Sequence, residues 1–151
     1  MNGYRWLLYC WVAPVTVLAL VPVLICVISG GRVNVVRGVL EARGGVLTPL
    51  FRRGNRWVGT ISAMTLGHVI LGRDEGCLTR CRFHEHVHIR QFEKWGVFLA
   101  VLYPAASLWC WLRGAHPYRD NPFEIEAYAA EAAHAAEQAP DAQADPAAEI
   151  A

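Results

Sequence analysis

Three of the six histidines and one glutamate lie within five consecutive positions, His84-Glu85-His86-Val87-His88. In an α-helix, His84 and His88 would lie one turn apart on one face with Glu85 beside them, which is the H-E-x-x-H spacing that binds zinc. In a β-strand, all three histidines would instead point to one face, because strand side chains alternate. The local structure therefore decides which side chains could share a metal ion.

The surrounding sequence favours the helix. Residues 75–95 contain no proline, exceed the length of most strands, and repeat apolar and metal-binding residue types at three- and four-residue steps. Asp74 is a suitable N-cap and Gly96 a suitable stop signal. His86 would then point away from the face of the other two histidines, so we expect a surface or packing residue there.

A hydrolytic zinc site needs three protein ligands, an open position for water and a nearby base. His84 and His88 would supply two ligands, and Glu85 could accept a proton from the bound water. The alternative is a histidine-rich amphipathic helix whose imidazoles only form hydrogen bonds.

The segment NPFEIEAY contains two candidates for the third ligand, Glu124 and Glu126. They cannot face the same point, because residues two positions apart diverge on a helix. Asn121 and Pro122 predict a helix start at which Glu124 could instead complete a capping box, its carboxylate reaching back to the cap amide. Metal binding and capping are both open for Glu124.

An H-E-x-x-H helix followed by a glutamate on a second helix resembles the zincin metallopeptidases, in particular the gluzincin branch. In membrane-bound gluzincins this glutamate starts an E-x-x-A-D pattern, and residues 124–128 match it except that Tyr128 stands at the aspartate position. The resemblance implies Zn²⁺ as cofactor, Glu124 as third ligand, Glu85 as general base and peptide hydrolysis as the reaction. In this pattern the aspartate orients one of the metal-binding histidines, so the tyrosine at this position leaves the source of that orientation open.

The segment TLGHVI resembles the strand that immediately precedes the metal helix in compact zincin-like proteins. His68 lies in this expected strand, which could hold a substrate backbone by strand addition. His116 and Tyr118 precede the Glu124 helix and could donate to a developing oxyanion, as histidine and tyrosine side chains do in zincins. Each residue has an ordinary alternative, namely packing for His68 and loop structure for the other two.

Residues 6–29 are uncharged and long enough to cross a hydrocarbon layer of about 30 Å as a helix. We interpret residues 1–31 as a transmembrane anchor, kinked at Pro14 or Pro22, rather than as a signal peptide, whose apolar core is usually shorter. Only Arg5 precedes this run, whereas a short following segment contains Arg32, Arg37, Arg43, Arg52, Arg53 and Arg56. The positive-inside rule then places the bulk of the chain in the cytoplasm.

The expected partners are membrane lipid and a peptide or protein substrate. No nucleic acid is expected, because proximity to a membrane already accounts for the arginines. The five cysteines do not suggest a disulfide framework, since Cys77 and Cys81 are four residues apart on a helix and the others lie in apolar runs.

Residues 96–112 form a second apolar run that contains Pro104. If this run crossed the bilayer, His88 and Glu124 would lie about 25 to 30 Å apart and could not share an ion. A three-ligand site therefore requires a buried, re-entrant or interfacial helix at this position.

The expected fold class is α+β. Strand-forming residues, with glycine turns at 44–45 and 54–55, predict a small, largely antiparallel sheet between residues 33 and 71. This sheet would pack on the H-E-x-x-H helix and a C-terminal helix to form a minimal zincin-like domain of residues 32–138. Residues 139–151, rich in proline, alanine and acidic residues, are expected to be a disordered tail.

These observations favour a membrane-anchored zinc metallopeptidase. The alternatives are a non-catalytic membrane protein that binds metal or acts as a scaffold, and a zinc hydrolase of a non-peptide substrate. Glu85 distinguishes enzyme from scaffold, because a structural metal site does not need a base.

Overall fold

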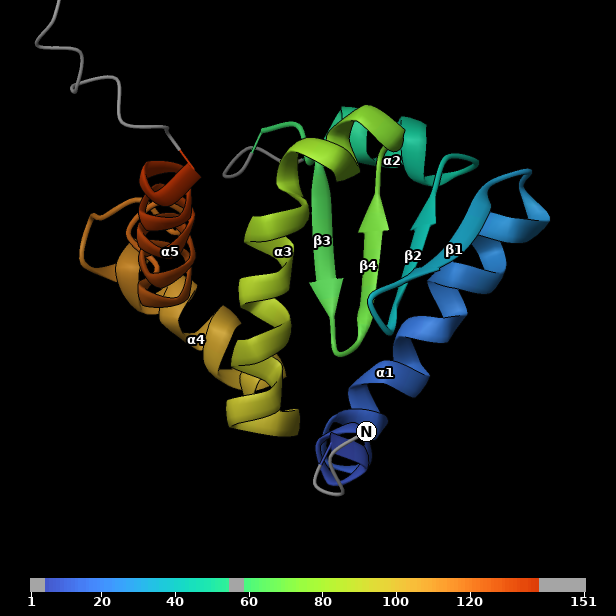
Figure 1. The fold of residues 1–151 in the computed structure, drawn as a ribbon. Helices are drawn as coiled ribbons and strands as arrows, with labels where there is room; N and C mark the ends of the chain where they lie inside the picture. The colour runs from blue at the N-terminus through green and yellow to red at the C-terminus, as the bar shows by residue number, and fades with distance from the viewer. Residues whose placement is uncertain (1–4, 55–58, 139–151) are drawn as a thin grey trace, which may run out of the picture.

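The computed structural model describes residues 5–54 and 59–138, which form a sheet with helices on both faces (Figure 1). The tail at 139–151 and part of the turn expected at 54–55 lie outside the described residues. The elements in chain order are α1 (Arg5–Ile28), β1 (Arg32–Val36), β2 (Val39–Arg43), α2 (Leu47–Arg53), β3 (Ala63–Leu66), β4 (Val69–Gly72), α3 (Glu75–Trp95), the 3-10 helix η1 (Gly96–Phe98), α4 (Leu99–Leu112) and α5 (Pro122–Gln138). The expected α+β class is confirmed.

The sheet has the strand order β1-β2-β4-β3 and is largely antiparallel, as expected, with one parallel pair. The β1–β2 and β3–β4 pairs are antiparallel, but the central β2–β4 pair is parallel. The expectation was incomplete because α2 and the segment after it carry the chain to the far edge, where β3 forms. Strand β4 then returns to the centre beside β2.

The first hairpin closes at Arg37-Gly38, not at Gly44-Gly45 as expected. Arg37 and Gly38 both have positive φ, 53° and 83°, which is the conformation of a two-residue type I′ turn. Gly44 and Gly45 instead connect β2 to α2, and a Cβ at Gly45 would collide with Ser29 beyond the end of α1. Gly45 therefore allows close packing between this connection and the end of α1.

The segment TLGHVI was expected to be the strand before the metal helix, but it is not one strand. Strand β3 ends at Leu66, a turn follows at Gly67-His68, and β4 begins at Val69. Gly67 has φ of 62°, and a Cβ there would collide with Thr16 of α1. The backbone N–H of His68 also donates to Thr16 Oγ1 at 3.1 Å, so contact with α1 fixes this turn.

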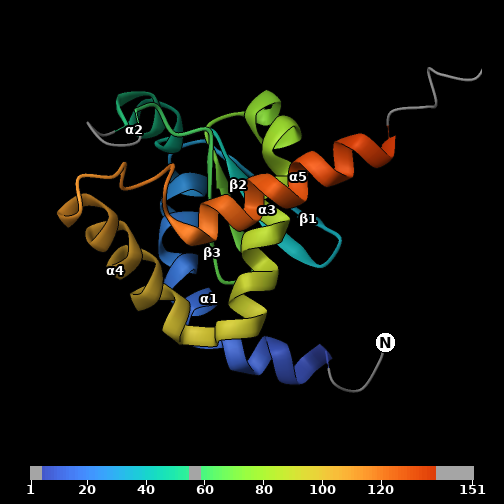
Figure 2. The same cartoon turned by 90° about the vertical axis from the view of Figure 1, so that its left-hand side faces the viewer.

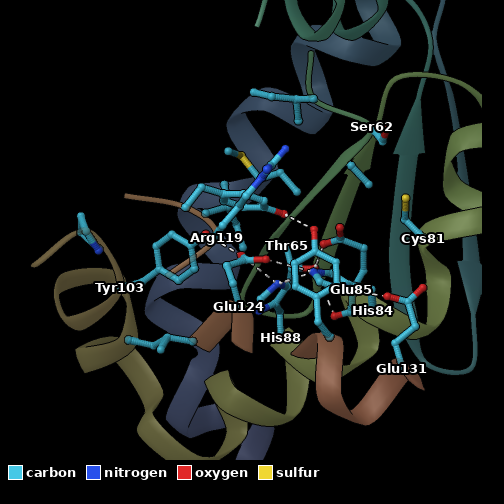
Figure 3. A pocket seen from close by; sticks show the side chains of 18 of the residues that line it. Ser62, Thr65, Cys81, His84, Glu85, His88, Tyr103, Arg119, Glu124 and Glu131 are labelled. Carbon is cyan, nitrogen blue, oxygen red and sulfur yellow. Dashed lines mark hydrogen bonds and ion pairs between the residues drawn. The ribbon is translucent and has the colours of Figure 1, made fainter. Parts of the chain in front are cut away.

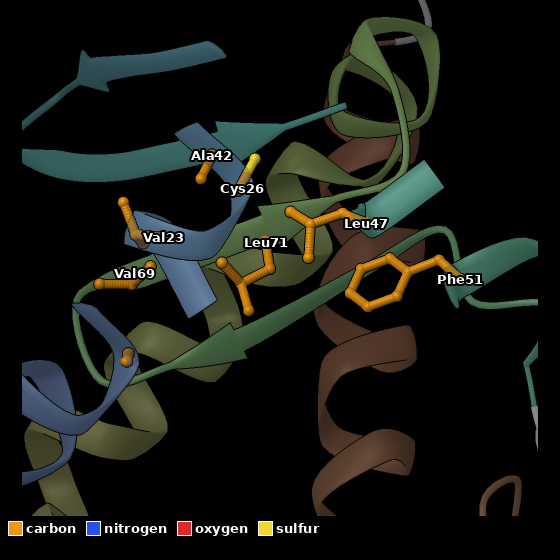
Figure 4. Packing of buried hydrophobic residues seen from close by; sticks show 8 residues of the cluster. Val23, Cys26, Ala42, Leu47, Phe51, Val69 and Leu71 are labelled. Carbon is orange, nitrogen blue, oxygen red and sulfur yellow. The ribbon is translucent and has the colours of Figure 1, made fainter. Parts of the chain in front are cut away.

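Alternate side chains of the sheet face two different helices. Ala42, Val69 and Leu71 pack with α1 and α2, as Figure 4 shows, whereas Val39 and Ile70 pack with α3. Strand β4 is buried on both faces because it lies in the middle of both clusters. The sheet is thus the central layer between α1 and α3.

Helix α3 begins and ends where its caps predict. Asp74 Oδ1 accepts from the backbone N–H of Cys77 at 2.8 Å, and Gly96, with φ of 59°, ends the helix. The histidine-rich segment is therefore helical. Helix α4 leaves the lower end of α3 at an angle, and α5 packs across α3, as Figures 1 and 2 show.

Two helical stretches are long and apolar enough to cross a membrane, Trp6–Ile28 and Glu75–Leu112. The first is α1, as expected, with both prolines inside it; its N-terminal part runs at an angle to the rest (Figure 2). The second consists of α3, η1 and α4 and bends at Gly96, so it is not one straight span. Helix α1 also contributes to the core, because Val23 and Cys26 pack on the sheet (Figure 4).

Candidate metal centre

Three side chains from α3 and α5 converge at one point (Figure 3). His84 Nε2 lies 3.1 Å from His88 Nε2 and 3.2 Å from Glu124 Oε2. His88 Nε2 lies 3.3 Å from Glu124 Oε1. All three residues are buried. Helix α4 therefore does not separate His88 from Glu124, which meets the geometric condition for a shared ion.

The remaining ring nitrogen of each histidine faces an acceptor. His88 Nδ1 lies 2.9 Å from Gln91 Oε1. The orientation of this amide is set on its other side, where Gln91 Nε2 donates to Phe123 O and to Glu126 Oε2, both at 2.9 Å. His84 Nδ1 lies 3.3 Å from a carboxylate oxygen of Glu131. Both Nδ1 atoms are thus suited to carry the proton in the neutral ring, leaving the Nε2 lone pairs to face the common point.

Two nitrogen lone pairs and a carboxylate around one point form a donor set for a cation. Zinc bonds of about 2.0 Å in a tetrahedral arrangement would place neighbouring ligand atoms about 3.3 Å apart. The observed separations of 3.1, 3.2 and 3.3 Å are close to this value. Glu124 Oε2 is buried, and within the described residues it has no hydrogen bond of suitable geometry. The residues present therefore fit a zinc ion.

Glu124 reaches this point because α5 has a different cap. Asn121 Oδ1 accepts from the backbone N–H of Phe123 at 3.0 Å, and the Asn121 N–H donates to Tyr118 O at 3.1 Å. The cap amide is thus occupied by a backbone carbonyl. The Glu124 carboxylate instead faces the histidines and accepts from Tyr103 Oη at 2.5 Å. This arrangement favours a site residue over the capping-box alternative.

The three charges influence each other strongly. Burial alone would lower the pKa of His84 and His88, but interactions with Glu124 raise both above their usual value. Burial would raise the pKa of Glu124, but its interactions with the two histidines hold it below its usual range. Protons and a metal ion would therefore compete for the same nitrogen lone pairs.

Glu85 lies beside the cluster and is almost fully buried. Its Oε2 accepts a hydrogen bond from Thr65 Oγ1 of β3 at 2.7 Å. Burial raises the pKa of Glu85, against the opposing effects of His88 and Thr65. A carboxylate with a raised pKa accepts a proton more readily near neutral pH, as a general base must.

A pocket of about 1180 Å³ opens in front of these residues. Residues 59–66, which include β3, form one wall, and the first turns of α4 with the loop before α5 form the other. Glu85 and the three candidate ligands all line it (Figure 3). A bound molecule could therefore reach the common point and the base together.

The two loop candidates also line this pocket. Tyr118 Oη lies 3.4 Å from Tyr128 Oη, and burial together with this contact raises the pKa of Tyr118, so it remains a neutral donor. His116 Nδ1 accepts from the backbone N–H groups of Tyr118 and Arg119 at 3.2 and 3.1 Å, so this imidazole also shapes the loop. Contact of either residue with a substrate stays a prediction.

His68 and His86 lie away from the common point. His68 is buried in the β3–β4 turn, with its ring against Tyr9 and its Nε2 3.3 Å from Glu93 Oε1, and it is not among the residues of the pocket wall. His86 Nδ1 lies 2.8 Å from Arg82 O, as expected for a side chain on another face of α3. The structure brings neither residue to the site.

Glu131 faces His84 from α5, where the gluzincin pattern would have an aspartate at position 128. Tyr128, at the aspartate position, packs its ring against His84 with centroids 4.7 Å apart. Glu131, nearly one turn later on α5, approaches the Nδ1 atom of the same histidine. Its spacing of seven residues from Glu124, two helical turns, was the signal available in the sequence.

Gln91 and Tyr103 were also missed by the sequence analysis. Gln91 follows His88 by three residues, a spacing that places both on one helix face and could have indicated the contact. Tyr103 had no local signal, because its contact with Glu124 depends on the bend between α3 and α4.

Comparison with protein-family models, curated proteins and solved structures gave no match for this chain.

Proposed function

We propose that this chain is a membrane-associated, zinc-dependent hydrolase of the H-E-x-x-H type that cleaves peptide bonds. The observation that carries this proposal is the convergence of His84, His88 and Glu124 within 3.3 Å, with Glu85 beside them on the same pocket wall. Zinc bound by these three residues would supply a Lewis acid and an activated water molecule.

Glu85 has the position and environment of a general base. It would take a proton from the attacking water and later return it to the amine that leaves. Thr65 holds one carboxylate oxygen, which restricts the orientation of the group without removing its second oxygen from use. Tyr118, kept protonated by its surroundings, is the candidate donor to the oxyanion.

An extended peptide is the substrate that the pocket wall suits best. Strand β3 lies at the edge of the sheet, where β4 is its one strand partner among the described residues, and its residues line the pocket. Exposed strand edges bind extended backbone by adding a strand. This feature favours a peptidase over a hydrolase of a non-peptide substrate.

The proposed location is a membrane, with α1 as the anchor and most of the chain on the cytoplasmic side. The length and apolar character of α1 support the anchor. The arginines that follow α1 support the orientation through the positive-inside rule.

The alternative is a metal-binding or scaffold protein without catalysis. It is favoured by the interactions of Glu124 with both histidines, which form a compensated buried cluster even without chemistry. Glu85 separates the two proposals, because only an enzyme needs this carboxylate to accept a proton.

Replacement of Glu85 by glutamine tests the proposed reaction. Glu85→Gln keeps the size and the contact with Thr65 but cannot accept a proton, so we expect peptide hydrolysis to fall at least ~10²-fold with zinc content unchanged. The assay is cleavage of a peptide library by zinc-loaded, full-length protein, with His86→Ala as the matched control on α3. Equal cleavage by wild type and Glu85→Gln, or none by wild type, would refute the peptidase proposal.

A further inference from the structure

Helix α4 has its polar side chains inside and most of its large apolar side chains outside. Tyr103 Oη donates to Glu124, Ser107 Oγ accepts from Asn121 Nδ2 at 2.8 Å, and the Cys110 thiol donates to a backbone carbonyl. The exposed large side chains of α4 are Val101, Leu102, Leu108, Trp109, Trp111 and Leu112. A helix that faces water shows the opposite distribution.

Helix α1 also has large apolar side chains on its outward face, and its inward face combines buried apolar side chains with polar ones. Thr16 Oγ1 accepts from the His68 backbone, and the Cys26 thiol donates to the carbonyl of Arg43, so these side chains point into the protein. No charged residue occurs from Trp6 to Ile28. The exposed large side chains are Trp6, Leu7, Tyr9, Trp11, Val17, Leu18, Leu20, Val21, Leu24, Ile25, Val27 and Ile28.

The outward faces of the two helices are joined. The rings of Trp11 on α1 and Phe98 at the start of α4 lie 6.1 Å apart, and both are exposed. Trp11 packs over Gly96, where a Cβ would collide with the indole. In Figure 1, the N-terminal half of α1 lies beside the lower end of α3, and α4 leaves α3 at that same end. We call these exposed side chains of α1 and α4, with Phe98, the α1–α4 surface.

The chemistry of this surface fits lipid better than another protein. It is uncharged, and an exposed apolar area this extensive is unusual for a protein surrounded by water. Trp109 and Trp111 lie near the end of α4, where the Arg113 guanidinium is 5.2 Å from the Trp109 ring centroid. Tryptophan next to arginine at the end of an apolar helix is typical of the membrane–water interface. The surface is also continuous with α1, which is long enough to span a bilayer.

We propose that the outward face of α4 lies in phospholipid together with α1, so that α4 is both a membrane-contacting helix and a wall of the pocket. The opposite face of α4 supplies Leu99, Tyr103 and Pro104 to the pocket wall. The pocket would therefore open next to the membrane surface. A substrate would then enter the pocket from the membrane surface. This last step rests on the proposed function, whereas the contact of α4 with lipid does not.

Photocrosslinking of the full-length protein in phosphatidylcholine vesicles tests this contact. Benzoylphenylalanine is placed at Leu108, at Val101 or, as control, at Ile125, an exposed apolar residue on α5 outside the α1–α4 surface. Circular dichroism verifies that each variant is folded. We expect a phospholipid adduct when the probe is at Leu108 or Val101, and no such adduct when it is at Ile125.

The other outcomes identify different surroundings and overturn the proposal. A crosslink from Leu108 and Val101 to a second copy of the chain would show a protein interface, and absence of any adduct at both positions would show water. The experiment requires neither zinc nor hydrolysis. Failure of the lipid contact is therefore distinguishable from failure of the proposed peptidase activity.

Discussion

The Nε2 atoms of His84 and His88 lie 3.1 Å apart, and each also faces one carboxylate oxygen of Glu124. The neighbours of His84 and His88 direct the other ring nitrogens to Glu131 and Gln91, so the two facing nitrogens are free for Glu124, a proton or a metal. Glu124, which would help to bind zinc, therefore also raises the affinity of both histidines for the protons that compete with zinc.

This competition predicts opposite pH dependences with and without zinc. In the metal-free protein the raised pKa of His84 and His88 means that their pairing with Glu124 stabilises the fold fully below about pH 6.5. That stability is lost as the pH rises through the raised folded pKa. Zinc requires deprotonated nitrogens, so its stabilising effect should grow over the same range.

The measurement is the thermal midpoint from about pH 6 to about pH 9, with a chelator or with zinc. As the pH rises, the thermal midpoint should decrease in the presence of chelator and increase in the presence of zinc. Glu124→Gln should flatten the chelator profile, because it removes the charge that raises both histidine pKa values. A metal-free protein that gains stability across this range would contradict the assigned ion pairs.

At the scale of elements, the turn at Gly67-His68 connects the candidate anchor to the site. Its contact with Thr16 of α1 holds the end of β3, and Thr65 of β3 holds Glu85. A change in this turn should therefore affect both the packing of the sheet and the position of the base.

Gly67→Ala tests the close approach of this turn to α1. Alanine at φ of 62° is strained and its Cβ would collide with Thr16, so we expect a loss of about 1 to 3 kcal/mol in unfolding free energy. Gly114→Ala is the control, because Gly114 has φ of 75° but open space around it. Thermal unfolding that shows equal destabilisation in both variants would exclude a packing contribution at Gly67.

The elements with local signals were predictable from sequence, and those set by distant contacts were not. Asp74 and Gly96 mark the ends of α3 through capping and backbone preferences that act within one turn. The split of TLGHVI depends on packing of Gly67 against α1, which no local pattern reveals. The parallel β2–β4 pair likewise depends on how the chain crosses between strands.

The same distinction applies to the site. The spacing of His84 and His88 follows from helix geometry, and the resemblance to gluzincins pointed to Glu124. The contact of Glu131 with His84 required the packing of α5 on α3, and that of Tyr103 with Glu124 required the bend at Gly96. Residues that support ligands from another element are therefore the part that sequence spacing predicts least.

At the scale of the whole molecule, the site joins parts of the chain that have little else in common. Helix α3 packs on the sheet and α5 packs on α3 (Figures 1 and 2). The first turns of α4 line the pocket at which these elements meet. A metal bound by α3 and α5 would tie these layers together. We propose that this junction is a zinc centre.

Zinc content of the purified full-length protein tests that claim most directly. Elemental analysis should find about one zinc ion per chain, lost in His84→Ala and His88→Ala and weakened in Glu124→Gln, because removal of one of three ligands opens the coordination shell. His86→Ala, on the same helix but facing Arg82, should retain the metal. Zinc retained by His88→Ala and lost from His86→Ala, or a zinc-free wild type after growth with added zinc, would contradict the account.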